Sequence, residues 1–307
     1  MPSLAVLPRA LRDDAGDTVR AILIVIVGYA VMTLGDVAGK WALLPAGVAA
    51  VMMGRGVAGS LTIGALVVAE GDWRRLLPVR WRLVAFRSVV HAAASVAWYV
   101  AWTVMPLADD YALGFTAPLM MTLLAIPMLG EKIRWRRALS TCLGFAGVLI
   151  MVRPDGDFWR PEVLILMPGI AAMAVSRIMT RVLSTTETAE CITFWLLLAH
   201  LPAGLCLLAL GFPAPGIMTA GVLAALAILG MASGGAHWLM ARAYSMGPVS
   251  ALAPYEYTLL IWGGIAGYLV FNETLESSTL AGAAVVAAAG LYNLHRERVR
   301  RTGAVAA

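Results

Sequence analysis

Long apolar segments separated by short polar connections run along nearly the whole chain. A window of about 20 apolar residues matches the length of a helix that crosses the hydrocarbon core of a bilayer. The pattern therefore predicts an all-α integral membrane protein with ten transmembrane helices. The predicted segments are 21–38, 47–69, 83–104, 111–129, 138–152, 163–183, 191–211, 217–241, 249–271 and 278–294.

An internal repeat divides these ten segments into two halves. The stretch from Ala101 to Glu131 aligns without gaps on the stretch from Ala243 to Glu273, at an offset of 142 positions. Repeats of this kind are found in many transporters. Because each half holds five segments, an odd number, the second half must enter the membrane in the opposite orientation, and we predict two inverted five-helix repeats. The aligned identities are Ala101/Ala243, Pro106/Pro248, Thr116/Thr258 and Glu131/Glu273.

The positive charges predict which way the chain is oriented. With the N-terminus in the cytoplasm, 18 of the 23 Lys and Arg residues fall in segments predicted to be cytoplasmic, and only Lys40, Arg153 and Arg160 fall outside. Lys and Arg gather on the cytoplasmic side of membrane proteins. We therefore predict a multi-pass protein of the inner membrane with both termini cytoplasmic, and no removable signal peptide. The predicted parts are an N-terminal tail (1–20), a first repeat (21–153), a second repeat (163–294) and a basic tail (295–307).

Composition supports a membrane protein and argues against several other classes. Hydrophobic residues make up 61% of the chain and charged residues 13%, with a mean hydropathy of +0.82, far from the average of a soluble domain. The net charge of +5 is mostly the topology signal, so the basic tail predicts contact with lipid headgroups and no binding of nucleic acid. Cys142, Cys191 and Cys206 are unclustered, which suggests neither a disulfide framework nor a zinc site.

No set of residues for catalysis stands out along the chain. Membrane enzymes need paired carboxylates, a nucleophile with its base, or His, Asp and Glu at metal-ligand spacing. The four histidines are scattered singly over four segments, and there is no GxxxxGK[ST] phosphate loop. We therefore predict that the protein is not an enzyme and that it uses neither ATP, nor a metal, nor another cofactor.

Matching polar and aromatic stripes occur in the third and eighth segments. The spacing i, i+4, i+7, i+11 places each stripe on one helical face. One interpretation is helix packing through interhelical hydrogen bonds. The other is a cavity between the halves, near the bilayer midplane, where rings stack on a planar or cationic solute. The 142-position offset pairs His91 with Ser233, Ser95 with His237, Trp98 with Met240 and Trp102 with Tyr244.

Charged residues inside predicted helices are candidates for function. Arg55 lies too deep to reach the outer surface, and its nearest acidic residue by depth is Asp36. The pair predicts either a structural ion pair between the first two helices or a contact of Arg55 with a carboxylate or phosphate of the solute. Glu256, in the ninth segment at the depth of His237, and Asp36 are the candidates for ion coupling; a static hydrogen bond of Glu256 is an equal alternative.

Four further charges have simpler structural interpretations. Arg87 and Arg177 lie close enough to cytoplasmic helix ends to extend their guanidinium groups to the membrane surface. Asp109 and Asp110 lie in the tight turn before the fourth segment, where we expect an N-cap.

Two runs of the chain resemble the repeat signatures of EamA-type drug/metabolite transporters: PLADDYALGFTAPLMMTLLAIPMLGEKIRWRRALSTCLGFAGVLIMVRP and GPVSALAPYEYTLLIWGGIAGYLVFNETLESSTLAGAAVVAAAG. The resemblance implies ten helices in two inverted repeats, with the solute path between the halves. Glu131 and Glu273 match the helix-ending glutamates of the family, which we interpret as structural groups, and Pro118 matches the proline of its fourth helix. Asn272 departs from the glycine that is common before Glu273.

These observations predict a secondary transporter that moves a small amphipathic organic metabolite by alternating access. The resemblance implies amino acids, S-adenosylmethionine-like or riboflavin-like solutes. We expect the solute to contact Arg55, His91, Ser95, Trp98, Trp102, His237, Met240 and Tyr244. Membrane lipids are the other expected partner, and a homodimer is compatible with the sequence. The alternatives are a polyspecific drug/metabolite efflux pump, a membrane-embedded enzyme for a lipid or prenyl substrate, and a channel, which should show polar rings on several helices.

Overall fold

The computed structural model describes most of the chain as helices and short connections, with no strand among the described residues. The described residues are 15–105, 107–114, 161–213, 215–246 and 258–273, with the positions 116, 117, 120, 124, 128, 142, 143, 146, 147, 150, 252, 255, 277, 278, 280–285, 287–289, 291 and 292.

Nine helical elements follow one another in this part of the chain. They are α1 (Ala15–Ala69), the 3-10 helix η1 (Trp73–Leu76), α2 (Trp81–Trp102), α3 (Leu107–Gly114), α6 (Pro161–Leu183), α7 (Ala189–Leu198), α8 (His200–Ala209), α9 (Ala220–Met246) and α11 (Thr258–Phe271). Five stretches of the described chain are long and apolar enough to cross a membrane: Arg20–Ala69, Trp81–Trp102, Leu164–Leu183, Ala189–Ala209 and Ala220–Met246. Ile261–Phe271 and Leu280–Ala289 are shorter apolar helices.

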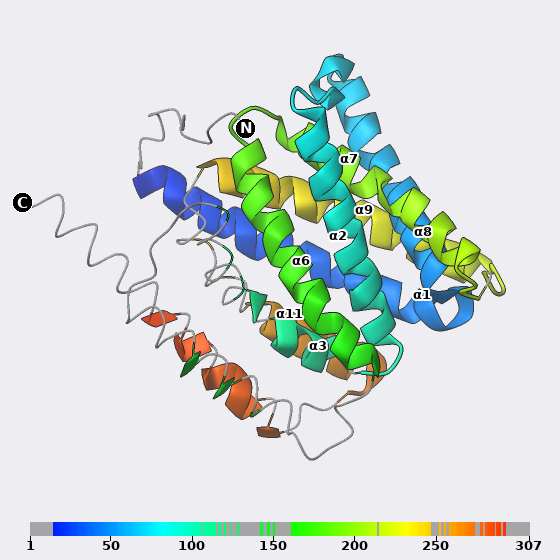
Figure 1. Ribbon diagram of the computed structural model, residues 1–307, viewed down its shortest axis with the longest axis vertical. Coiled ribbons are helices and arrows are strands. Elements are labelled where there is room, and N and C mark those ends of the chain that lie inside the picture. The colour runs from blue at the N-terminus through cyan, green and yellow to red at the C-terminus, as the bar shows by residue number, and fades with distance from the viewer. Residues whose placement is uncertain are drawn as a thin grey trace, which may run out of the picture.

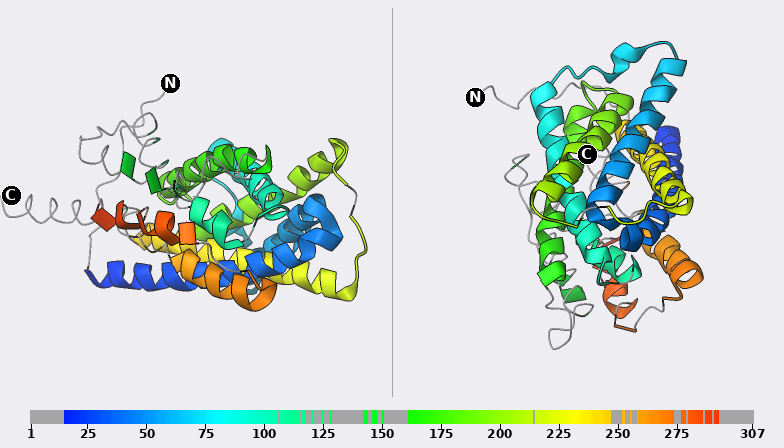
Figure 2. Two further views of the ribbon diagram at one scale, coloured as in Figure 1. Left: turned by 90° about the horizontal axis from the view of Figure 1, so that it is seen from below. Right: turned by 90° about the vertical axis from the view of Figure 1, so that its right-hand side faces the viewer.

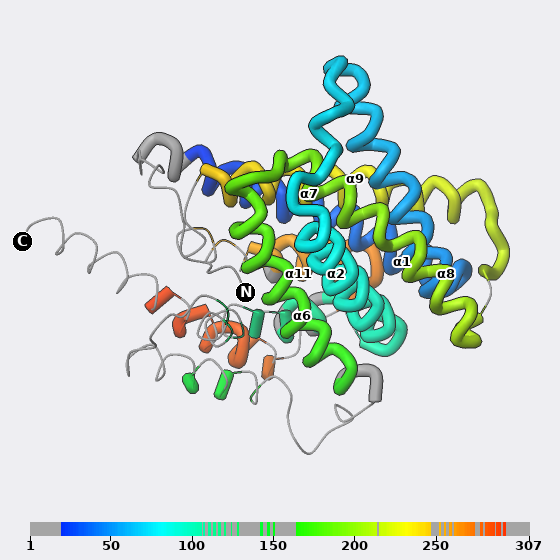
Figure 3. Tube along the Cα trace, turned by 45° about the horizontal axis from the view of Figure 1, so that its top comes forward, coloured from blue at the N-terminus to red at the C-terminus, as the bar shows by residue number. Residues whose placement is uncertain are grey.

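The first two predicted segments follow each other closely in the structure as the two helical parts of α1. A kink at Gly47, with φ of 79° and ψ of 161°, separates the two parts, and Pro45 lies just before it. Proline removes a backbone donor, and glycine adopts the left-handed region without steric cost. The predicted break between the first two segments is therefore present at Gly47, where the backbone is not helical, and Figure 3 shows the change of direction along the blue tube.

The helices pack in pairs around the two parts of α1. Helix α9 lies alongside α1 over most of its length, and α2 lies alongside α6 (Figures 1 and 2). Helices α7 and α8 also contact α1, and α11 contacts both α1 and α3. Helices from before residue 153 and after residue 163 thus alternate in one bundle.

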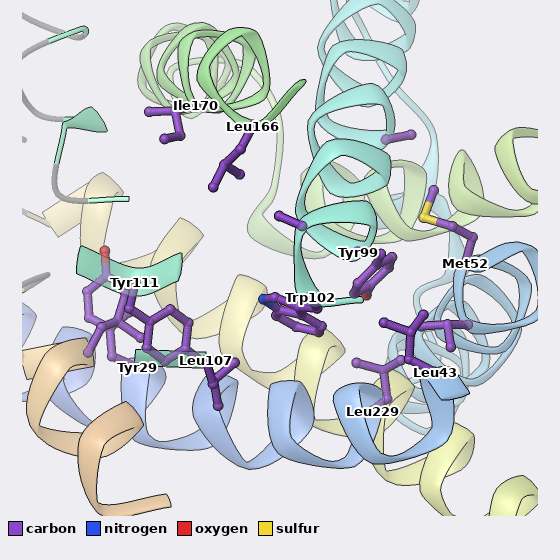
Figure 4. Packing of buried hydrophobic residues seen from close by; sticks show 14 of the residues in the cluster. Tyr29, Leu43, Met52, Tyr99, Trp102, Leu107, Tyr111, Leu166, Ile170 and Leu229 are labelled. Atoms are coloured by element: carbon purple, nitrogen blue, oxygen red, sulfur yellow. The ribbon is translucent and has the colours of Figure 1, made fainter. Parts of the chain in front are cut away.

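Aromatic side chains fill the interior where these pairs meet. Tyr99 and Trp102 of α2 contact each other edge to face, with ring centroids 5.0 Å apart. Tyr29 of α1 and Tyr111 of α3 are buried in the same apolar cluster (Figure 4). Aromatic rings in a membrane interior bring polar atoms into a core that is otherwise aliphatic.

At one end of the bundle, the connection after α1 is held to the start of α7. Arg75 bonds to Glu190 at 2.7 Å and to Glu70, and Glu187 accepts hydrogen bonds from the backbone N–H of Val79 (2.9 Å) and Arg80 (2.8 Å). Burial lowers the pKa of Arg75, but the two carboxylates outweigh this effect and raise the pKa above its ordinary value. These connections are both predicted to be cytoplasmic, and they lie on one side of the bundle.

Close packing of α1 against α9 depends on glycine at Gly230. A Cβ atom added there would collide with Ala58 and would lie 2.7 Å from the backbone nitrogen of Gly59. We expect Gly230→Ala to lower the free energy of unfolding by about 1–3 kcal/mol, as overpacking does. Gly64→Ala, whose Cβ would meet only Phe194 at 3.7 Å, should change it by less than about 1 kcal/mol. Thermal unfolding in detergent, followed by tryptophan fluorescence, tests this difference, and equal midpoints for both variants would contradict it.

Candidate functional site

A cavity of about 110 Å³ lies among α1, α2, α3, α6, α9 and α11. The residues that line this cavity come from both halves of the chain. They include every residue that the sequence analysis predicts to contact the solute. These are Arg55, His91, Ser95, Trp98, Trp102, His237, Met240 and Tyr244. Asp36 also lines the cavity. The structure therefore brings the predicted set together around one space.

The two predicted stripes face this space from α2 and α9. The rings of His91 and His237 contact each other edge to face, with centroids 5.0 Å apart. The two interpretations of the stripes are thus compatible, because the same side chains make an interhelical contact and line a cavity. Met240 and Tyr244 extend the α9 side of the wall.

A third histidine joins this pair, although it is absent from the predicted site. His200 of α8 is fully buried, its ring centroid lies 5.7 Å from that of His91, and its Nε2 lies 3.0 Å from the hydroxyl of Ser95. The hydroxyl of Ser176 on α6 lies 3.3 Å from Nδ1 of His91. The interpretation of the histidines as scattered singly is wrong for these three, while His295 lies outside the described residues. Within the described part of the chain, no group of His, Cys, Asp and Glu has the arrangement of a metal site.

Arg55 and Asp36 each bond to a tyrosine and not to each other. Arg55 Nη1 donates to the hydroxyl of Tyr99 at 2.9 Å, and its guanidinium carbon lies 5.9 Å from the centre of that ring. Asp36 Oδ2 accepts from the hydroxyl of Tyr111 at 2.7 Å. The predicted alternative of a direct ion pair between the first two helices is therefore wrong. Arg55 is instead hydrogen-bonded to Tyr99 of α2, and Asp36 to Tyr111 of α3.

Arg87 is buried, contrary to the predicted extension to the membrane surface. Only 5% of its surface is exposed. Nε donates to Thr180 Oγ1 at 3.1 Å and Nη1 donates to the carbonyl of Ile192 at 2.9 Å. Helices α6 and α7 cover the side chain, so the guanidinium group turns inward and lines the cavity together with Arg177.

The predicted N-cap at Asp109 and Asp110 is also wrong, because α3 begins before them at Leu107. Asp110 is fully buried, and its Oδ2 accepts a hydrogen bond of 2.9 Å from the indole of Trp102. Trp102 therefore lines the cavity with its ring and holds α3 with its Nε1. The N–H of Leu107 instead donates to Glu273 Oε2 at 3.0 Å.

Glu273, which the sequence analysis interprets as a structural group, contacts residues of the first half of the chain. Its Oε1 lies 2.6 Å from Nζ of Lys40 at the end of the first part of α1. Lys40 also donates to the carbonyl of Met105, after α2, at 3.0 Å. The connections at 40, 105 and 273, all predicted to be outside, thus meet at one place. Glu131, Pro118 and Glu256 lie outside the described residues.

A matching contact occurs at the other end of the bundle. Arg181, near the end of α6, donates through Nη1 to the carbonyl of Tyr244, near the end of α9, at 2.6 Å. At the 142-position offset, Tyr244 corresponds to Trp102, and Arg181 to Gly39, which precedes Lys40. In each half a basic residue thus donates to a carbonyl at or just after the end of the aligned helix, at positions that the offset brings close but does not superimpose.

Comparison with known proteins gives one consistent result. The model of the EamA-like transporter family matches residues 19–153. An S-adenosylmethionine uptake transporter of Rickettsia bellii (strain RML369-C) is 28% identical over 201 residues, 66% of this chain and 68% of that protein. A riboflavin transporter of Rhizobium johnstonii is 30% identical over 225 residues, 72% of each chain. A solved crystal structure covers 94% of this chain and 99% of its own with a TM-score of 0.66; at 15% identity, this shows a similar fold alone.

Proposed function

Because the chain belongs to the EamA-like transporter family, we propose that it is a secondary transporter whose central cavity carries one small amphipathic metabolite at a time. The family and the named relatives support a multi-pass membrane protein that transports small metabolites, and they favour a transporter over an enzyme. The observation that carries the finer proposal is the cavity itself. Histidine, tryptophan, tyrosine and arginine side chains from both halves line this cavity, although the helices that carry them are otherwise mostly apolar.

Alternating access is the mechanism that we propose. Lys40 and Glu273 hold the two halves together at the predicted outer end, and Arg181 bonds to the carbonyl of Tyr244 at the predicted inner end. In a transporter that rocks two repeats around a fixed site, the contact of Lys40 with Glu273, which joins the halves, must open when the cavity opens on the outer side. Arg181 and Tyr244 both lie in the second half, so their contact moves with that half.

The proposed topology is ten helices in two inverted repeats, 21–153 and 163–294, in the inner membrane with both termini cytoplasmic. The match of the family model to residues 19–153 supports the bounds of the first repeat. The connection after α1 meets the start of α7 at one end of the bundle, and residues 40, 105 and 273 meet at the other. These two groupings support connections that alternate between the two sides of the membrane.

The solute that we propose has a planar ring and charged groups. Trp98 and Tyr244 offer ring faces for stacking, and the relatives are named for S-adenosylmethionine and riboflavin, both of which contain a planar heterocycle. A polyspecific efflux pump is the second candidate. The polar groups that converge on the cavity favour a dedicated carrier, since such groups fix the orientation of one ligand.

Counterflow in liposomes tests this function. Purified protein is reconstituted in vesicles loaded with unlabelled S-adenosylmethionine or riboflavin, and uptake of the labelled compound is followed. We expect uptake of at least one of the two, stimulated by the same compound inside and absent from protein-free vesicles. A thermal-shift screen with the same compounds supports the result, because a ligand of the native state raises its stability. Neither uptake nor a shift at millimolar concentrations would contradict the proposal.

A further inference from the structure

Arg55 is a buried cation with no carboxylate at ion-pair distance among the described residues. It is 6% exposed, and its guanidinium group makes one hydrogen bond within that part of the chain, to Tyr99. Its Nε is buried without a partner there. A guanidinium group offers five N–H donors, and a buried charge that lacks a counter-ion is strongly unfavourable. The geometry therefore leaves a place for an anionic group.

Asp36, which lines the same cavity, is a buried carboxyl group that lacks a cationic partner among the described residues. It is 7% exposed, and among the described residues no Lys or Arg lies at ion-pair distance from it. Its hydrogen-bond partner is the hydroxyl of Tyr111, which is a neutral group. Figure 4 shows Tyr99 and Tyr111 well apart, on α2 and α3, so the two charges are held by separate anchors.

The two charges are close enough to interact but do not pair directly. The positive charge of Arg55 acts on Asp36 through space, yet no hydrogen bond or ion pair joins them. Two opposite charges held apart on one cavity wall suit a ligand that carries both signs on neighbouring atoms. Charge-assisted hydrogen bonds of about 2.8 Å at each end let a small dipolar group bridge such a gap.

We propose that the cavity recognises a zwitterionic head group of the α-amino acid type, with the carboxylate on Arg55 and the ammonium group on Asp36. This inference rests on the proposed transport function and names the class of solute that it serves. The rest of the solute lies along the aromatic wall that includes Trp98. The zwitterion neutralises both buried charges, whereas an uncharged planar solute leaves both unpaired.

Arg87, which also lines the cavity, does not fill this role. Arg87 already donates to Thr180 and to the carbonyl of Ile192, and it lies about three turns from Tyr99 along α2, at 3.6 residues per turn. The three clustered histidines bond to serine hydroxyls and backbone carbonyls. Arg55 combines an Nε without a partner among the described residues with an interaction through space with Asp36.

The test compares probes that differ in one charged group. Isothermal titration measures the affinity of detergent-purified protein for S-adenosylmethionine, for its decarboxylated analogue, and for riboflavin. We expect the wild type to bind S-adenosylmethionine about 10- to 100-fold more tightly than the decarboxylated analogue, the range for hydrogen bonds to charged groups. Arg55→Gln should abolish this preference. Asp36→Asn should lower the binding affinity for both S-adenosylmethionine and its decarboxylated analogue, because both carry the ammonium group.

Two controls separate this inference from effects on folding and from the function itself. Arg82→Gln removes a charge from an exposed position of α2 and should keep the preference, and Arg55→Lys keeps a cation and should retain part of it. Thermal unfolding confirms that each variant is folded. Tight binding and transport of riboflavin, unchanged by Arg55→Gln, would overturn the zwitterion site and leave the transport function intact. Transport of neither compound by the wild type would contradict both.

Discussion

Trp98→Ala is expected to raise the KM for transport about 10- to 100-fold, with normal expression and thermal stability. Trp98 lines the cavity and keeps part of its surface exposed. Stacking of a planar ring on an aromatic side chain is worth about 1–3 kcal/mol when it is removed by alanine substitution, which corresponds to this range of affinity. Counterflow uptake at a series of solute concentrations measures the effect.

Matched variants decide whether the effect is due to stacking. Trp98→Phe keeps an aromatic face and should recover most of the affinity. Trp41→Ala removes an indole from the outside of α1, where 49% of the side chain is exposed, and should leave the KM unchanged. Trp102→Ala is a poorer test, because its Nε1 donates to Asp110 at 2.9 Å and its loss would also disturb α3. Since Trp98 also interacts with the Asp110 carboxyl group, thermal unfolding of each variant accompanies the transport assay. A KM for Trp98→Ala equal to that of the wild type would exclude this side chain from the solute site.

Lys40→Glu is expected to reduce the transport rate at least tenfold, while the double variant Lys40→Glu/Glu273→Lys recovers part of it. The single change places two carboxylates together where the halves now meet at 2.6 Å, and removing one partner of a largely buried pair costs about 3–5 kcal/mol. The exchange restores opposite charges. Recovery is partial because a lysine at 273 cannot accept the hydrogen bond from the N–H of Leu107.

The control for this exchange is Glu70→Lys. Glu70 pairs with Arg75 near the surface, where its side chain is 48% exposed, and exposed pairs contribute about 0–1 kcal/mol. We expect a rate close to that of the wild type. Solute affinity, measured separately by titration, should change little in Lys40→Glu, since Lys40 does not line the cavity. Equal rates in the single and double variants would argue against a gate formed by this pair.

Periodicity and the internal repeat indicate side chains that line one cavity in the structure, because both depend on residues that share a helical face. His91, Ser95, Trp98 and Trp102 follow one stripe of α2, and their repeat partners follow one stripe of α9, so their convergence requires only that the two faces meet. The predicted segment 83–104 and α2 also agree within two residues at each end. Long apolar windows set these bounds, and such windows are a strong signal.

Other features depend on tertiary contacts that a sequence pattern does not contain. His200 enters the cluster because α8 packs close to α2, and nothing at its repeat-related position, Ala58, indicates a site. Arg87 lies close to a helix end, so its depth suggests a surface position; only the cover provided by α6 and α7 turns it inward. The break at Gly47 is different: the apolar windows predict two separate segments there, and the backbone of Gly47 is indeed not helical.

Solute-protected labelling of one cavity position tests the central claim most directly. Met173→Cys, in a background without Cys142, Cys191 and Cys206, places a thiol on the α6 side of the cavity, and Leu61→Cys places one on an exposed face of α1. A membrane-impermeant thiol reagent is applied to each side of oriented vesicles. The account predicts that the thiol of the Met173→Cys variant is labelled from both sides and protected by solute, while the thiol of the Leu61→Cys variant is never protected. Labelling of the cavity thiol from one side only, or without protection by a transported solute, would contradict it.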